Sequence, residues 1–232
     1  MHIPDGFINA STSLGAGAVA LGGLTVSLKR AAAALDDRQV PLSGLVAAFI
    51  FAGQMLNFPV AGGTSGHLLG GVLAAVLVGP WAGAICIAVV LLVQALFADG
   101  GLTALGLNIV NMGLIGAVGG YALFLAARRA LPSTGSGVVL ASGIAGGLSV
   151  VLAAVGFLVE YMLGGTAAVP LGSVVAAMIG VHALIGVGEG FITAATVGAV
   201  LSVRPDLVYG ASDLLPAVQL RPQPATAREA TP

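Results

Sequence analysis

The sequence predicts an all-α integral membrane protein with about seven transmembrane helices. Charged residues make up only 7% of the chain, whereas a soluble domain carries roughly 25%. The mean hydropathy is +1.07, and 58% of the residues are apolar. The 36 glycines suit membrane helices that pack closely, although they would weaken the helices of a soluble protein. The apolar runs are continuous and do not alternate, which favours helices over a barrel.

Seven segments are long enough to span, or nearly to span, a hydrocarbon core of about 30 Å. They are Leu14–Leu28, Gly44–Leu56, Leu68–Val78, Ala82–Phe97, Leu107–Ala127, Val138–Tyr161 and Ser173–Leu201. The second and third are too short to cross alone at about 1.5 Å per residue.

The positions of the basic residues predict an orientation. If the amino terminus lies outside, every Lys and Arg falls on the cytoplasmic side, as the positive-inside tendency requires. These residues are Lys29, Arg30, Arg38, Arg128, Arg129, Arg204, Arg221 and Arg228. From Ser202 the chain becomes polar and rich in proline. We therefore expect one membrane domain over residues 1–201 and a mobile cytoplasmic tail over residues 202–232.

The segment between the two short apolar stretches, residues 57–67, is apolar but contains too much Gly and Pro for a helix. Irregular backbone at membrane depth persists only where protein or a water-filled cavity satisfies it. We therefore predict a re-entrant loop from the outer face that delivers His67 to a recessed site.

Met1-His2 is the sharpest chemical feature of the sequence. The free amine, the His2 amide nitrogen and the His2 imidazole can chelate one metal ion in fused rings, and His67 can complete a square plane. Planar nitrogen coordination suits nickel, copper or low-spin cobalt better than zinc or magnesium. In the alternative interpretation His2 contacts lipid headgroups and His67 caps a short helix. Cys86 is alone, so a thiolate site within the chain is excluded.

Other polar residues are candidates for orienting these ligands. His182 and Glu189 are seven residues apart on one predicted helix, and therefore share a face. The full candidate set is Asn57, Ser65, Asn108, Asn111, His182 and Glu189. The alternative for each is a hydrogen bond that only fixes helix packing.

Four sequence stretches, in order, resemble the CbiM/NikM family of metal-specific membrane subunits of cobalt and nickel energy-coupling-factor transporters. They are the opening Met1–Phe7, residues 57–70, Asp99–Gly106 with Asn108 and Asn111–Gly113, and His182 with Gly188–Thr193. The resemblance covers residues 1 to about 201. It implies that Met1 and His2 supply three nitrogens to the metal and His67 the fourth.

The resemblance also implies partners: a coupling transmembrane subunit, a pair of cytoplasmic ATPases and often a small accessory membrane subunit. ATP-driven uptake across the plasma membrane of a prokaryote follows, with cobalt for cobalamin synthesis favoured over nickel by the order of the motifs. We expect no enzymatic activity and no intrinsic cofactor, because the chain has one lysine and no nucleotide-binding loop. Nucleic acid is not an expected partner, because the chain has no basic cluster outside its loops.

The competing hypothesis is a stand-alone secondary transporter for a small organic solute. In that case Glu189 and His182 would form a proton relay near the middle of the membrane. A purely structural scaffold leaves the recessed histidine loop unexplained.

Overall fold

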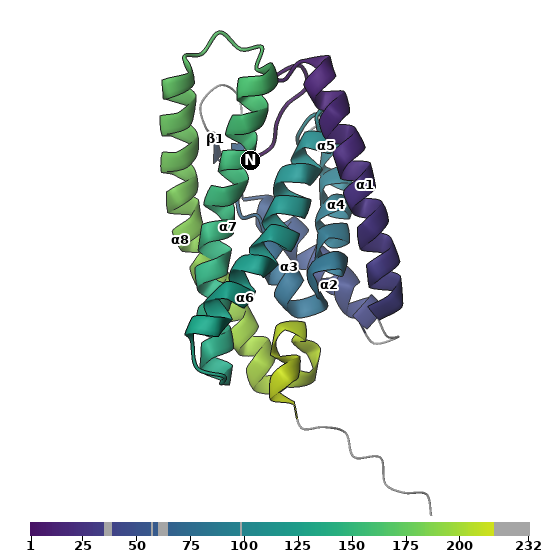
Figure 1. The fold of residues 1–232 in the computed structure, drawn as a ribbon, viewed down its shortest axis with the longest axis vertical. Helices are drawn as coiled ribbons and strands as arrows, with labels where there is room; N and C mark the ends of the chain where they lie inside the picture. The colour runs from purple at the N-terminus through teal and green to yellow at the C-terminus, as the bar shows by residue number, and fades with distance from the viewer. Residues whose placement is uncertain (35–38, 57, 60–64, 98, 216–232) are drawn as a thin grey trace, which may run out of the picture.

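The computed structural model describes residues 1–34, 39–56, 58–59, 65–97 and 99–215, and these form a nearly all-helical bundle (Figure 1). The helices are α1 (Ala10–Ala34), α2 (Gln39–Gln54), α3 (Gly71–Val78), α4 (Pro80–Leu96), α5 (Leu105–Asn108), α6 (Gly120–Ala130), α7 (Gly135–Gly164) and α8 (Leu171–Val203). A π-helix, η2 (Ile109–Gly119), joins α5 to α6, and two 3₁₀ helices, η3 (Pro205–Leu207) and η4 (Tyr209–Leu214), follow α8. Two short antiparallel strands, β1 (Phe58–Pro59) and β2 (Ser65–Gly66), pair Phe58 with Gly66 and Pro59 with Ser65.

Within the described residues, four helical stretches are long and apolar enough to cross a membrane. They are Ala10–Ala34, Leu105–Ala130, Gly135–Gly164 and Leu171–Val203. The second combines α5, η2 and α6, so the predicted segment Leu107–Ala127 is one continuous helical run. The shorter helices α2 and α4 are also apolar. The all-α membrane class predicted from composition is confirmed.

Helix α3 is the centre of the bundle, because all eight of its residues are buried. It contacts η2 so closely that a Cβ on Gly71 would lie 2.6 Å from the carbonyl carbon of Gly116. The predicted segment Leu68–Val78 becomes helical only at Gly71, since Gly70 has a φ of 75°, which no helix residue adopts. The three residues before Gly71 are therefore free to form part of a loop.

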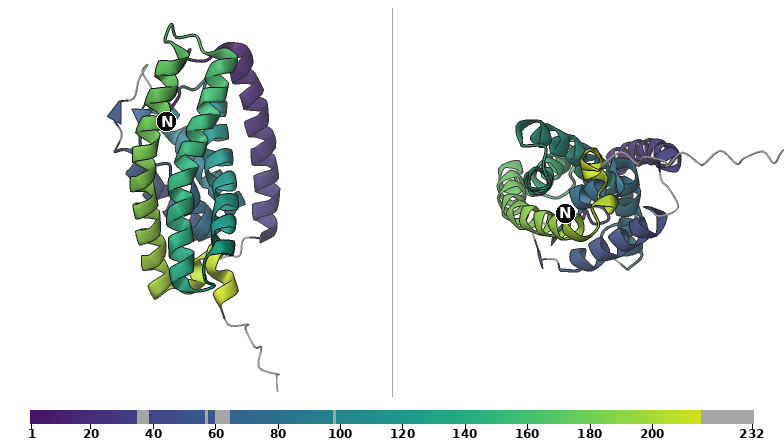
Figure 2. Two further views of the ribbon diagram at one scale, coloured as in Figure 1. Left: turned by 60° about the vertical axis from the view of Figure 1, so that its left-hand side comes forward. Right: turned by 90° about the horizontal axis from the view of Figure 1, so that it is seen from below.

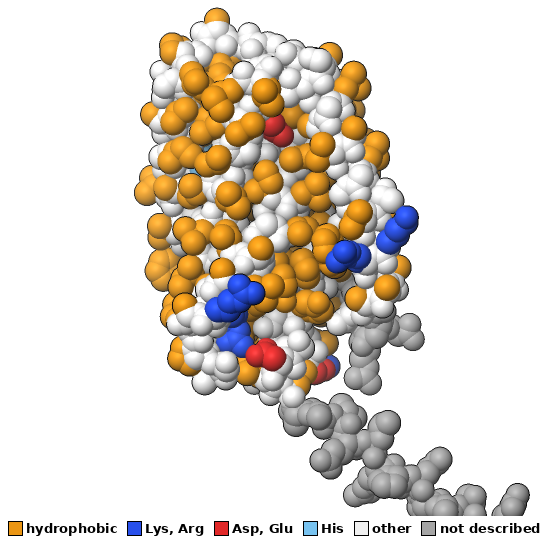
Figure 3. All heavy atoms as spheres, in the orientation of Figure 1, with side chains coloured by type: hydrophobic (Ala, Val, Ile, Leu, Met, Phe, Trp, Pro, Cys, Tyr) orange, Lys and Arg blue, Asp and Glu red, His pale blue; other side chains and the backbone are white. Residues whose placement is uncertain are grey.

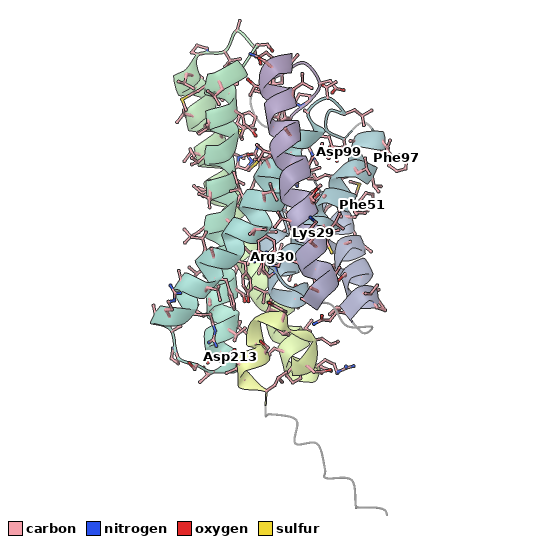
Figure 4. The ribbon with its side chains drawn as sticks, turned by 45° about the vertical axis from the view of Figure 1, so that its right-hand side comes forward. Lys29, Arg30, Phe51, Phe97, Asp99 and Asp213 are labelled. Carbon is pink, nitrogen blue, oxygen red and sulfur yellow. The ribbon has the colours of Figure 1, made fainter. Side chains whose placement is uncertain are left out.

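Basic side chains gather toward the end of the bundle where the carboxyl terminus leaves (Figures 3 and 4). Arg30 lies over the Trp81 ring at 4.8 Å, and Arg128 pairs with Asp213 at 2.8 Å. This placement is what the positive-inside hypothesis needs, although the direction of the bundle in the membrane stays a prediction.

The predicted tail does not begin as mobile chain at Ser202. Helix α8 continues to Val203, and in η3 and η4 the chain packs back on the bundle, with Val208 and Ala211 buried. A Cβ on Gly210 would lie 3.0 Å from the Phe124 ring, so this turn fits closely under α6. The segment after Ser202 is polar and rich in proline on average, but it also contains apolar residues that pack on the bundle, and these keep it ordered to Leu215. Residues 216–232 lie outside the described residues.

Candidate metal site

The amino terminus lies inside the bundle. The chain runs from the upper end of α1 back into the interior, and the N-terminus lies among the helices in all three views (Figures 1 and 2). Met1 and Ile3 are fully buried, and His2 is 3% exposed. An α-amino group and an imidazole are thus removed from water at the centre of an apolar protein.

Asn108 holds this buried segment at Ile3. The Ile3 N–H donates to the Asn108 Oδ1 at 2.8 Å, and the Asn108 amide donates to the Ile3 carbonyl at 3.3 Å. The N–H of Gly101 donates to the same carbonyl at 2.9 Å. Asn108 therefore holds the backbone one residue beyond His2, and its role in orienting a metal ligand stays a prediction.

His67 lies beside His2. The two imidazole rings stack with centroids 4.5 Å apart and planes inclined by 29°. His67 is fully buried, and its Nδ1 lies 2.6 Å from the Leu68 carbonyl oxygen. Because a carbonyl only accepts, Nδ1 carries the hydrogen, and the lone pair is on Nε2. That Nε2 is buried and has no hydrogen-bond partner in the described part of the chain.

The loop after His67 is held from two helices. Glu189 of α8 accepts the N–H of Leu69 and the N–H of Gly70, one on each carboxylate oxygen, both at 2.8 Å. Gln54 of α2 donates to the Leu69 carbonyl at 2.7 Å. Glu189 is 1% exposed and Gln54 is fully buried. The backbone that presents His67 is therefore fixed by interior side chains.

His182 and Glu189 share the buried face of α8, as their spacing predicted. Their hydrogen bonds go elsewhere, however, because the His182 Nδ1 lies 2.8 Å from the Met178 carbonyl of its own helix. The His182 Nε2 is buried without a partner among the described residues. The proton relay of the alternative hypothesis gains no hydrogen bond from this arrangement.

Asn111 bonds another helix and not the loop of His67. Asn111 donates to Glu160 of α7 at 2.6 Å, so it belongs to a separate buried pair. Asn57 lies outside the described residues, and for Ser65 only the backbone, in β2, is described.

Sequence reasoning missed four buried or nearby polar residues: Gln54, Gln94, Asp99 and Glu160. Gln54, Gln94 and Glu160 are polar residues within otherwise apolar helices, and this pattern in the sequence could have identified them. Asp99 lies in the segment after α4, where its Oδ2 is 3.8 Å from the His2 Nε2.

Burial sets the protonation of the terminal donors. It lowers the pKa of the Met1 amine to about 4, because the charged form loses its water, while the charge of Asp99 opposes this shift. Burial also lowers the pKa of His2 to about 3, with a further contribution from the charge of the amino terminus. At neutral pH both groups are neutral, so each has a lone pair for a metal.

The described residues contain no cluster of three or more His, Cys, Asp or Glu side chains arranged to hold a metal. A metal ion at the His2–His67 stack would need donor atoms other than these side chains. The Met1 amine and the His2 amide are of this kind.

Residues 2–207 match the family described as cobalt uptake substrate-specific transmembrane region, CbiM. A putative fused nickel transport protein NikMN of Archaeoglobus fulgidus is 40% identical over 209 residues, which are 90% of this chain and 68% of the relative. A putative metal transport protein of Haloquadratum walsbyi is 39% identical over 95% of this chain and the whole relative. The crystal structure of a truncated transition metal transporter is similar, with a TM-score of 0.79, 34% identity, and coverage of 87% of this chain and 99% of that one.

Proposed function

The chain belongs to the CbiM family and is a cobalt or nickel transport subunit, and from this premise we propose that it captures the divalent ion for an ATP-driven uptake transporter. The observation that carries the proposal is the buried meeting of the amino terminus with the stacked rings of His2 and His67. Met1, His2 and His67 are all buried, and the His67 Nε2 has no hydrogen-bond partner among the described residues.

We assign four nitrogens to the metal: the Met1 amine, the His2 amide, the His2 Nδ1 and the His67 Nε2. The first three form a five-membered and a six-membered chelate ring, which fixes them near one plane. The lone pair of the His67 Nε2 follows from the hydrogen bond of its Nδ1 to Leu68. Four nitrogens in a plane are the geometry that divalent nickel favours, and low-spin cobalt accepts it as well.

The site also compensates the charge of the ion. The amide nitrogen loses its proton on binding and becomes anionic, which leaves one net positive charge on the complex. Asp99, close to the His2 Nε2, and Glu189, behind the His67 loop, are the nearby carboxylates. A buried metal complex without such partners would be strongly destabilised.

Ion capture requires other subunits for transport, because the chain has no nucleotide-binding loop. We propose a coupling transmembrane subunit, a pair of cytoplasmic ATPases and, in some assemblies, a small accessory membrane subunit. The amino terminus would face the outside of a prokaryotic plasma membrane, so that the ion enters from that side. Cobalt destined for cobalamin synthesis is our preferred cargo, and nickel is the alternative.

Metal binding by the purified full chain tests the site. Replacing His2 or His67 by Ala, or adding one residue before Met1, should abolish tight Ni²⁺ and Co²⁺ binding while the protein stays monodisperse in detergent. His182→Ala should weaken binding by about 10–100-fold, as is usual for groups that act around a metal without ligating it. Tight binding by the extended chain would show that the amine is not a ligand. Metal content measured by mass spectrometry on protein from cells decides between cobalt and nickel.

A further inference from the structure

One peptide group connects Glu189 to His67. The carbonyl oxygen of the Leu68–Leu69 peptide accepts the Nδ1–H of His67 at 2.6 Å, and the N–H of the same peptide donates to a Glu189 oxygen at 2.8 Å. The carboxylate and the imidazole therefore lie at the two ends of a single polarisable unit. Neither residue contacts the other directly.

The second oxygen of Glu189 makes a parallel connection. It accepts the N–H of the next peptide, Leu69–Gly70, and the carbonyl of that peptide accepts a hydrogen bond from Gln54. The N–H groups of Leu69 and Gly70 are successive and meet at one carboxylate, as in the backbone concavities that bind anions. Each carboxylate oxygen thus contacts one peptide, and only one of the two peptides leads to His67.

We infer that Glu189 is a positioning residue for the metal site, which acts on His67 through the Leu68–Leu69 peptide in a carboxylate–peptide–histidine relay. This inference rests on the proposed function, since it concerns the basicity of the His67 Nε2 toward the ion. A carboxylate at the N–H of a peptide increases the negative charge on its carbonyl oxygen, because hydrogen bonds in a chain polarise one another. A stronger acceptor at Nδ1–H makes Nε2 a stronger donor to the metal, as directly bonded carboxylates do for metal-bound histidines.

The environment of the relay supports this role. Glu189 is almost completely buried, so water does not screen its charge. In the described part of the chain, each of its two oxygens accepts one backbone N–H, so the carboxyl group is held against these two peptides. The relay also favours the His67 tautomer with its hydrogen on Nδ1. Glu189 holds the N–H of the Leu68–Leu69 peptide, and the carbonyl of this peptide then faces the His67 Nδ1.

Glu189→Gln tests the relay in the full chain loaded with Ni²⁺ in detergent. The amide side chain retains the size of Glu189 but removes the charge and one acceptor. We expect Ni²⁺ affinity to fall by about 10–100-fold and the ligand-field absorption band of the remaining complex to move to longer wavelength, because His67 becomes a weaker donor. A band at the wild-type wavelength would overturn the relay, whatever the affinity.

Two matched controls separate the relay from general loosening. Gln54→Leu releases the Leu69 carbonyl and loosens the same loop, yet it leaves the Leu68–Leu69 peptide bonded at both ends, so its band should not move. Glu160→Gln removes another buried carboxylate, which is bonded to Asn111, and should change neither the band nor the affinity. An equal band shift in the Gln54 variant would overturn the inference, because loop position alone would then explain the effect.

The wild-type protein provides a test that does not depend on a folded Glu189 variant. In the Cu²⁺-loaded chain, pulsed electron paramagnetic resonance reports the quadrupole coupling of the remote imidazole nitrogens. The relay predicts that one remote nitrogen, the Nδ1 of His67, shows a strong donated hydrogen bond, and values typical of water-exposed imidazole at every remote nitrogen would overturn it. If the wild type binds neither Ni²⁺ nor Cu²⁺, the proposed function itself fails, and this result is distinct from binding without a relay.

Discussion

Asn108→Ala should detach the buried amino terminus from its anchor. The change removes the acceptor of the Ile3 N–H, and the remaining bond at Ile3, from Gly101, serves only the carbonyl. A buried donor left without a partner costs about 1–3 kcal/mol, a cost that disappears when the terminus withdraws into water. Since about 1.4 kcal/mol corresponds to a factor of ten, the inserted state loses a factor of about 5–150.

The apparent affinity for the ion falls with the population of the inserted terminus. We therefore expect Asn108→Ala to bind Ni²⁺ about 5–150-fold more weakly than the wild type in calorimetric titrations of the detergent-solubilised protein. Asn111→Ala is the matched control, because Asn111 is one helical turn away but bonds Glu160. It should lower thermal stability and leave the affinity within about twofold. Equal affinities of the Asn108 variant and the wild type, with both folded, would refute the anchoring role.

Two further predictions concern the loop and the orientation. Gly70→Ala should lower the melting temperature and weaken Ni²⁺ binding. A side chain at a φ of 75° costs about 1–2 kcal/mol, and its Cβ would lie 2.8 Å from the Ile50 side chain. A variant as stable as the wild type would contradict the assigned turn. In a Cys86→Ala background, a cysteine at Ser11 should react with an impermeant reagent in intact cells and one at Ser202 should not, while outside labelling of Ser202 would reject the proposed orientation.

The sequence predicts the class of the fold well, because the information is in composition and apolar length. Leu171–Val203 and Gly135–Gly164 contain the predicted spans Ser173–Leu201 and Val138–Tyr161 in full. The first residue of α3 could not be predicted from the sequence in this way. It depends on the positive φ of Gly70, which is set by contacts from α2 and α8 that no local pattern encodes.

The site shows a similar division. The chelating chemistry of Met1 and His2 can be read directly from the residue types, and this assignment stays a prediction. The partners of the other polar residues cannot be read from spacing. Asn108 and Asn111 look like neighbours on an α-helix, yet Asn111 lies in the wider π-helical turn of η2, and the two side chains reach different elements. Glu189 has the spacing of a partner for His182, but its partners are backbone N–H groups more than 100 residues away.

The number of protons released on metal binding tests the proposed site most directly. Because burial lowers the pKa of the Met1 amine to about 4 and that of His2 to about 3, both are already neutral at pH 7 and release nothing. The His2 amide must lose its proton to bind, so about one proton should leave per ion. The affinity for Ni²⁺ should therefore rise by about tenfold per pH unit between roughly pH 5 and 8. Below about pH 4 protonation of the amine adds a second competing proton and steepens the loss. Titration calorimetry with Ni²⁺ at pH 7 in two buffers of different ionisation enthalpy measures the count: about one supports coordination by the amine, the amide and the two imidazoles, and a count near zero contradicts it.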